Sequence, residues 1–226
     1  MISGYSRRYG AAAWLRKALI SAFTGLMAIS GVASAAPVTI VALGDSLTHG
    51  FGLPLNDGFV PQLERWLQAN GAPEATVINA GVSGDTTAGG LERFDWSVAG
   101  GGDAVIVELG GNDLLRAIPP EASRANLDGI LTKAGEKGLP VLLTGMSAPL
   151  NYGPDYKEAF DSMYPDLAEK HGAIYDPYFL EGMTDPPDPK LFQSDGIHPN
   201  KDGVTKIVAR FGPLVLDLIA RVEAAQ

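Results

Sequence analysis

Three residues of the types that carry out nucleophilic catalysis lie in two short segments of the chain. Ser46 lies in residues 44–47, Gly-Asp-Ser-Leu, directly after a short apolar run. Asp195 and His198 lie in residues 195–199, Asp-Gly-Ile-His-Pro. Nucleophilic catalysis needs an activated hydroxyl, a base that accepts its proton and a group that orients the base. A serine, a histidine and an aspartate can fill these three places.

The chain contains 3 histidines, and His198 is the one that best fits the role of base. Asp195 lies three residues earlier, and a glycine turn between the two allows the carboxylate to reach one ring nitrogen. Such a contact fixes the tautomer and stabilises the imidazolium. His171 precedes a glycine at a predicted helix end, which is a common place for a cationic residue. His49 is close to Ser46 but has no acidic residue placed to orient its ring.

Donors for a developing oxyanion are also available in polar, glycine-rich segments. The backbone N–H of Ser46 is one donor. The N–H of Gly84 is a second, because glycine lets the backbone approach a substrate closely, and the side-chain amide of Asn112 is a third. Each candidate also has a purely structural interpretation, because serine often caps a helix and glycine, asparagine and aspartate often form turns.

Short apolar runs alternate with helical patterns along the rest of the chain. The runs have the length of strands that are covered on both faces, and they lie at residues 38–43, 76–80, 104–109, 139–145 and 173–175. Stripes of apolar residues at helical spacing predict helices over residues 58–70, 121–138, 155–171 and 201–224. Pro165 predicts a kink in the third of these helices, and Gly212 with Pro213 predicts an interruption of the last one.

This alternation predicts an α/β fold in a single domain, a three-layer α/β/α sandwich around a flavodoxin-like, five-stranded parallel sheet. Ser46, Gly84 and Asn112 follow the first, second and third strands. Asp195 and His198 directly precede the last helix. The carboxyl ends of parallel strands meet at one edge of a sheet, where ligands bind. The fold therefore predicts that the candidate residues gather at that edge.

The N-terminal segment has the layout of a secretory signal peptide. Four basic residues are followed by an apolar stretch over residues 18–33 and by Ala-Ser-Ala at residues 33–35. We therefore expect a signal peptide at residues 1–35 and one domain at residues 36–226. The stretch is short and rich in polar and glycine residues for a membrane span, so no stable membrane anchor is expected after cleavage. The expected location is periplasmic or secreted.

Loss of residues 1–35 removes four basic residues and no acidic one, which changes the net charge from −9 to −13. A protein this acidic does not suit nucleic-acid binding, which relies on Lys and Arg contacts to phosphates. The chain has no cysteine, which excludes disulfides and thiolate metal sites. The sequence therefore predicts no nucleic-acid partner, and no cofactor is expected.

Four segments of the chain resemble, in the same order, the motif blocks of the GDSL or SGNH hydrolases. They are Gly-Asp-Ser-Leu at residues 44–47, Gly-Val-Ser-Gly-Asp at 81–85, Gly-Gly-Asn-Asp at 110–113 and Asp-Gly-Ile-His-Pro at 195–199. One block alone is weak evidence, whereas four in order are specific. Residues 79–87 and 151–153 are similar to the branch of bacterial arylesterases and thioesterase I/protease I/lysophospholipase L1. The resemblance covers residues 36–226 as one SGNH hydrolase domain.

The resemblance implies that Ser46 is the nucleophile, His198 the base and Asp195 its partner. It also implies an oxyanion hole made by Ser46, Gly84 and Asn112, and it implies no metal. The expected activity is that of a serine esterase acting through an acyl-enzyme on aryl esters and short to medium acyl esters. Thioesters and lysophospholipids are further candidate substrates. The expected partner is therefore a small acyl-ester or lipid-like substrate.

Other activities stay open on the sequence alone. Within the same family, the chain could be a carbohydrate O-deacetylase, or an acyltransferase that uses an alcohol in place of water. Leu150, Met183 and Phe192 favour apolar substrate contacts over the polar groove that a sugar requires. We expect the groove to include the segment after Gly84 and residues 149–153.

Two further alternatives come from other classes of protein. A flavodoxin-like module would bind a phosphate or a flavin at the helix N-terminus after residues 44–48. That interpretation leaves the Asp195 and His198 pair unexplained. Metal-dependent phosphoester hydrolysis would instead use Asp45 and Asp113 together with this pair.

Overall fold

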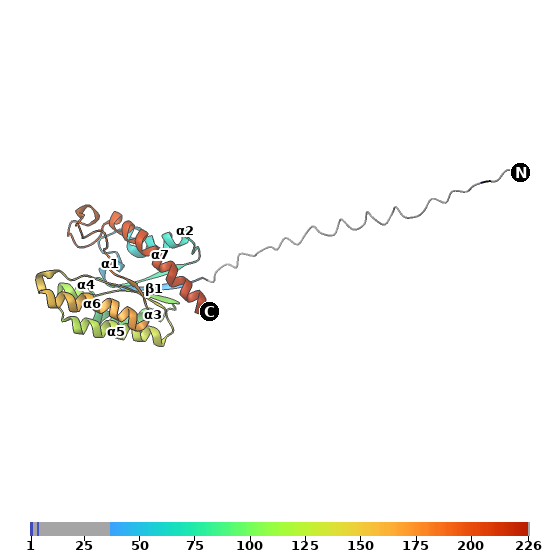
Figure 1. The fold of residues 1–226 in the computed structure, drawn as a ribbon. Coiled ribbons are helices and arrows are strands. Elements are labelled where there is room, and N and C mark those ends of the chain that lie inside the picture. Colours follow the sequence, from blue (N-terminus) through green and yellow to red (C-terminus); the bar gives the residue numbers. More distant parts are fainter. Residues whose placement is uncertain (2–3, 5–36, 226) are drawn as a thin grey trace. The chain divides into compact units, whose positions relative to one another are not determined.

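Five parallel strands form a central sheet in the order β2-β1-β3-β4-β5 (Figure 1). Their bounds are β1 Thr39–Gly44, β2 Thr76–Gly81, β3 Ala104–Glu108, β4 Val141–Thr144 and β5 Ile174–Asp176. This computed structural model describes Met1, Gly4 and residues 37–225. The expected signal peptide at residues 1–35, and its boundary with the domain at residues 36–226, lie outside the described residues.

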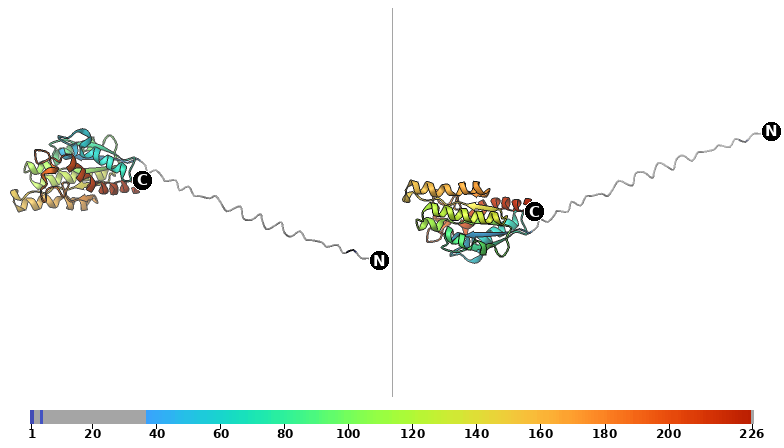
Figure 2. Two further views of the ribbon diagram at one scale, coloured as in Figure 1. Left: turned by 90° about the horizontal axis from the view of Figure 1, so that it is seen from above. Right: turned by 90° about the horizontal axis from the view of Figure 1, so that it is seen from below.

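Helices cover both faces of the sheet. Helices α2 and α7 pack together on one face, and α3, α5 and α6 lie on the other (Figures 1 and 2). Their bounds are α1 Ser46–His49, α2 Phe59–Ala69, α3 Thr87–Val98, α4 Gly111–Leu115, α5 Pro120–Glu136, α6 Pro154–His171 and α7 Lys201–Ala225. The predicted three-layer α/β/α sandwich is confirmed. In the part of the chain that the structure describes, no helix is long and apolar enough to span a membrane.

The register of β2, β1 and β3 brings the carboxyl ends of these three strands to one level. Gly44 at the end of β1 pairs with Gly81 of β2 on one side and with Glu108 of β3 on the other. All residues of β3 are buried, as are five of the six in β1. The chain order reverses between β1 and β3, and ligands bind at such a switch point in open α/β sheets. The turns that follow these strands therefore leave the sheet side by side.

Helix α3, Thr87–Val98, was not predicted from the sequence. It buries Thr87, Gly90 and Phe94, so it lacks the stripe of large apolar residues that marks an amphipathic helix. A Cβ atom on Gly90 would lie 2.3 Å from Cδ1 of Leu109. The helix approaches the sheet through a small residue, and the hydrophobic pattern therefore does not reveal it.

The prediction that Gly212 and Pro213 interrupt the last helix is wrong, because α7 continues through both residues. A Cβ atom on Gly212 would lie 2.3 Å from the indole of Trp66 on α2. Glycine therefore allows α2 and α7 to approach closely. Proline inside a helix costs about 3 kcal/mol, and the long buried stripe of α7 offsets that cost. Helix α6 also contains a proline, Pro165, and the kink predicted there stays a prediction.

Candidate active site

Ser46 is the first residue of α1, at the turn that follows β1. The helix N-cap is Asp45, whose Oδ1 accepts a hydrogen bond from the Leu47 N–H at 2.9 Å. Since the cap is the preceding aspartate, the structural interpretation of Ser46 as an N-cap does not hold. Its hydroxyl is left free to face other groups.

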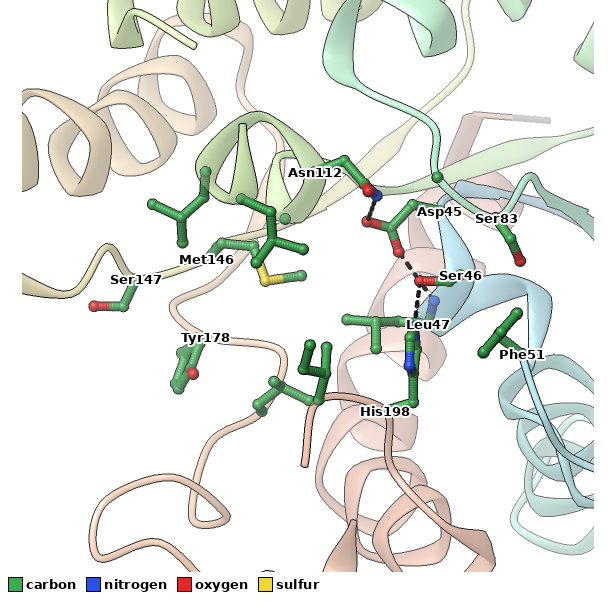
Figure 3. Close-up of a pocket in the computed structure, with 16 residues that line it drawn as sticks. Asp45, Ser46, Leu47, Phe51, Ser83, Asn112, Met146, Ser147, Tyr178 and His198 are labelled. Atoms are coloured by element: carbon green, nitrogen blue, oxygen red, sulfur yellow. Dashed lines mark hydrogen bonds between the residues drawn. The ribbon is translucent and has the colours of Figure 1, made fainter. Parts of the chain in front are cut away.

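Ser46, His198 and Asp195 form a continuous hydrogen-bonded chain, and Figure 3 shows the contact between Ser46 and His198. His198 Nε2 lies 2.9 Å from Ser46 Oγ, and His198 Nδ1 lies 2.7 Å from Asp195 Oδ2. The Phe51 ring packs against the imidazole with the ring centroids 4.7 Å apart. The structure thus brings together three residues that are far apart in the sequence, with one ring nitrogen facing the hydroxyl and the other facing the carboxylate.

The Asp195 carboxylate is held in place by its own turn. Its Oδ1 accepts hydrogen bonds from the backbone N–H groups of Ile197 and His198, at 2.9 and 3.0 Å. Gly196 adopts a φ of 70°, which glycine tolerates better than other residues. The hydrogen bond to the His198 ring, followed by these two backbone donors, lowers the pKa of Asp195 to about 2. Asp195 is therefore ionised throughout the pH range of ordinary ester assays.

The other two histidines are engaged elsewhere. His49 Nδ1 lies 3.0 Å from Ser83 Oγ, and His171 Nε2 lies 2.6 Å from Asp128 Oδ1 at the C-terminal end of α6. The structure therefore brings His198, and neither of these residues, to Ser46.

Both further oxyanion candidates lie at the same edge as Ser46 and line the same cavity. Asn112, in α4 after β3, donates from Nδ2 to Asp45 Oδ2 at 3.0 Å, which leaves the second hydrogen of that nitrogen available. Gly84 adopts a φ of 84°, and its carbonyl accepts a hydrogen bond from Arg116 Nη2 at 2.8 Å. Among the described residues, no acceptor is found for the backbone N–H of Ser46 or of Gly84.

Sequence reasoning missed the part of Asp45 in this arrangement. Asp45 is 2% exposed, and it joins the turn after β1 to Asn112 after β3. Burial raises the pKa of this carboxyl group, and the hydrogen bonds from Leu47 and Asn112 partly offset that rise. An aspartate directly before a helix-initiating serine was an available signal, because this is a preferred N-cap residue.

A cavity of about 460 Å³ opens beside the hydrogen-bonded chain. Its lining is mostly apolar, with side chains that come from separate loops and helices: Leu47, Leu114, Leu115, Met146, Leu180 and Ile197. A second hollow continues from it and shares Leu115, Tyr178, Leu180 and Ile197. Together the two hollows form an apolar groove that starts at Ser46 and is suited to a hydrocarbon chain.

The predicted groove residues fall into different environments. Phe192 and Pro149 line the second hollow, and Ser83 and Gly84 line the first. Met183 instead lies in the hydrophobic core, and Leu150 is 68% exposed and lines neither hollow. The expectation that Met183 and Leu150 contact the substrate is therefore not supported by their positions.

The residues of the metal-dependent alternative do not converge. Asp113 accepts hydrogen bonds from Thr87 and Ser123 in the interior, with Thr87 Oγ1 at 2.5 Å and Ser123 Oγ at 2.8 Å. Within the described ranges, no group of three or more His, Cys, Asp or Glu side chains is arranged to hold a metal ion. Asp113 instead ties the turn after β3 to α3 and α5.

The fold and this arrangement of residues are those of a serine-type acylhydrolase on a flavodoxin-like sheet. Residues 42–206 match the model of the GDSL-like lipase/acylhydrolase family. The chain belongs to this family, which makes it a hydrolase of carboxylic esters. Membership of a hydrolase family removes the basis for a flavin-binding module.

Curated relatives and solved structures agree with this assignment. The chain is 36% identical to "Esterase TesA" of Pseudomonas aeruginosa over 91% of its own length and 100% of that protein. It is 35% identical to an arylesterase of Vibrio mimicus over 75% of its length and 84% of the relative. The crystal structure of TesA superposes with a TM-score of 0.74 at 37% identity, covering 80% of this chain and 99% of that one.

The depressed pKa of Asp195 predicts how its contribution to stability depends on pH. The folded value of about 2 lies below the unfolded value of about 3.9, so the contribution is fully present above pH 4 and is lost as the pH falls through 2. The gap in unfolding free energy between the wild type and Asp195→Asn should therefore narrow from pH 5 to pH 2.5, as measured by urea unfolding. Asp217→Asn, at an exposed site, controls for loss of a carboxylate. A constant gap would contradict the prediction.

Proposed function

We propose that this ester hydrolase is an exported serine esterase with Ser46 as nucleophile, His198 as base and Asp195 as the group that orients the base. The observation that carries the proposal is the pair of short contacts on the two nitrogens of His198, 2.9 Å to Ser46 Oγ and 2.7 Å to Asp195 Oδ2. With Nδ1–H donating to the carboxylate, Nε2 carries a lone pair toward the hydroxyl, as a general base requires.

In the proposed reaction Ser46 Oγ attacks the ester carbonyl carbon while His198 Nε2 takes the hydroxyl proton. The oxyanion receives hydrogen bonds from the N–H groups of Ser46 and Gly84 and from the free amide hydrogen of Asn112. The C–O bond to the leaving group then breaks, and His198 returns the proton to the leaving oxygen. A water molecule, deprotonated by His198, attacks the acyl-enzyme and releases the acid and free Ser46.

The substrates that the groove favours are esters with an apolar acyl chain or an aryl group. Its leucine, isoleucine and methionine lining offers about 0.8 kcal/mol for each methylene removed from water. Such a lining is a poor match for the hydroxyl groups of a sugar, which disfavours carbohydrate O-deacetylation. Thioesters and lysophospholipids carry the same kind of acyl chain and are proposed as further substrates.

The nucleophile assignment is tested by Ser46→Ala, which should abolish hydrolysis of p-nitrophenyl butyrate. Removal of a catalytic serine costs on the order of a millionfold in kcat in well-studied serine hydrolases. Ser162→Ala is the matched control, because Ser162 lies on α6 and lines neither hollow. It should keep kcat within about threefold, since surface substitutions have small effects. Substantial turnover by Ser46→Ala would refute the assignment.

The acyl groove is tested by Leu180→Ala, since Leu180 lines both hollows. The substitution removes three carbon atoms of apolar lining, so kcat/KM for p-nitrophenyl octanoate should fall about threefold to tenfold relative to that for the acetate. Leu55→Ala controls for loss of a leucine outside the groove, because Leu55 is 83% exposed. An equal loss for acetate and octanoate would show that Leu180 does not contact the acyl chain.

The proposal of export rests on the sequence pattern of residues 1–35. Four basic residues are followed by an apolar stretch and by Ala-Ser-Ala before the domain. We expect cleavage after residue 35 and release of a chain that begins at Ala36, in the periplasm or outside the cell. N-terminal sequencing of the protein recovered from a periplasmic extract tests this boundary. A chain that retains residues 1–35 in the membrane fraction would contradict it.

A further inference from the structure

Glu108, the last residue of β3, is a carboxyl group with no solvent exposure, and it lies directly behind the turn that carries Ser46. The proposed reaction does not use it. Its Oε2 accepts hydrogen bonds from Thr48 Oγ1 at 2.8 Å, from Thr48 N at 3.2 Å and from Asp45 N at 3.3 Å. Its other oxygen, Oε1, is buried and has no hydrogen-bond partner among the described residues.

The three donors on Oε2 come from both sides of the nucleophile. Asp45 precedes Ser46 and Thr48 follows it by two residues, so one carboxyl oxygen fixes both ends of the turn. Gly44 shows how closely the turn packs on this group. A Cβ atom there would lie 2.0 Å from Thr48 Oγ1 and 2.8 Å from Glu108 Oε2. The direction in which Ser46 presents its hydroxyl therefore depends on Glu108.

The surroundings of Glu108 disfavour a negative charge. Burial raises its pKa well above the usual value, and the nearby Asp45 carboxylate raises it further. The nearby cation on the adjoining helix α3, Arg93, donates to the Gly44 carbonyl at 2.9 Å but is paired with Asp85 at 2.6 Å. On α6, the neutral hydroxyl of Tyr164 donates to the Leu109 carbonyl. A buried carboxylate without a paired cation is costly, and such a group becomes protonated instead.

We propose that Glu108 is a positioning residue for the nucleophile. It is a neutral carboxylic acid whose Oε2 accepts hydrogen bonds from the turn on both sides of Ser46. The proposal rests on the proposed role of Ser46 as nucleophile. Glu108 touches no substrate atom and acts only through Asp45 and Thr48.

Two substitutions at Glu108 separate its role as a hydrogen-bond acceptor from its charge. Glu108→Gln keeps an oxygen acceptor and is neutral, so kcat should stay within about threefold of the wild type. Glu108→Leu removes the acceptor, so kcat per folded molecule should fall about tenfold to hundredfold through misplacement of Ser46, with KM within about twofold. A merely structural role would lower the unfolding midpoint and leave kcat of the folded protein unchanged. Retention of wild-type kcat by folded Glu108→Leu would overturn the positioning role.

Thr48→Val gives a second test that does not depend on Glu108→Leu folding. It removes only the hydroxyl that donates to Oε2, and loss of this hydrogen bond should lower kcat about threefold to tenfold at unchanged KM. A folded Thr48→Val enzyme with wild-type kcat would overturn the proposal. A Glu108→Gln enzyme that loses as much kcat as Glu108→Leu would show that the carboxylate, and not the neutral acid, is required.

Ser46→Ala, treated in parallel with a fluorophosphonate probe, separates this inference from the proposed function. If Ser46→Ala is inactive and unlabelled while the Glu108 and Thr48 variants react with the probe at the wild-type rate, the positioning role alone fails. If Ser46→Ala is still active and labelled, the proposed nucleophile fails. Labelling that is slow in Glu108→Leu and restored in Glu108→Gln supports the positioning role.

Discussion

The hydrogen bonds of the buried Asp45 carboxylate connect the two strands at the switch point of the sheet. One oxygen caps α1 through the Leu47 N–H, and the other accepts from Asn112 Nδ2 beyond β3. The strand register brings these groups within reach, because Gly44 and Glu108 end their strands at the same level. A helix cap of this kind contributes about 1 kcal/mol. Here the same carboxylate also positions the side-chain amide of Asn112 relative to the candidate nucleophile. The geometry of the site therefore follows from sheet register.

The site has two halves, a histidine half on the loop of Asp195 and His198 and a serine half on the turn of Ser46, and they are anchored differently. Asp195 and His198 lie on a loop that makes most of its hydrogen bonds within itself, whereas the turn of Ser46 is anchored on buried groups of the sheet. Gln193 links the halves, since its backbone N–H donates to the His198 carbonyl at 2.8 Å and its Nε2 donates to the Phe51 carbonyl at 2.8 Å. Phe51 follows α1 and also packs on the imidazole. These attachments hold the loop beside α1, so that His198 lies within hydrogen-bonding distance of Ser46.

The sequence predicts those parts of the fold that short patterns specify. All five strands and the edge at which the polar turns meet follow from apolar runs and from the rule that parallel strands end together. Helix α3 escaped prediction because Gly90 takes the place of a large apolar residue. The continuity of α7 escaped because the contact of Gly212 with Trp66 is made across two elements. The roles of Asp45 and Glu108 depend in the same way on partners that only the folded chain brings near.

The groove shows most clearly that residue type and position in the sequence do not predict which side chains line it. Met183 and Phe192 lie in one loop segment and are both large and apolar, yet Met183 packs in the core near Gly203 of α7 while Phe192 lines the groove. Two backbone bridges shape this loop, since Phe192 pairs with Pro199 and Thr184 pairs with Pro187. These bridges fix which side of the loop faces the apolar hollow. The lining of the groove therefore depends on loop pairing around residues 184–199, whereas the turn that carries Ser46 is placed by the sheet.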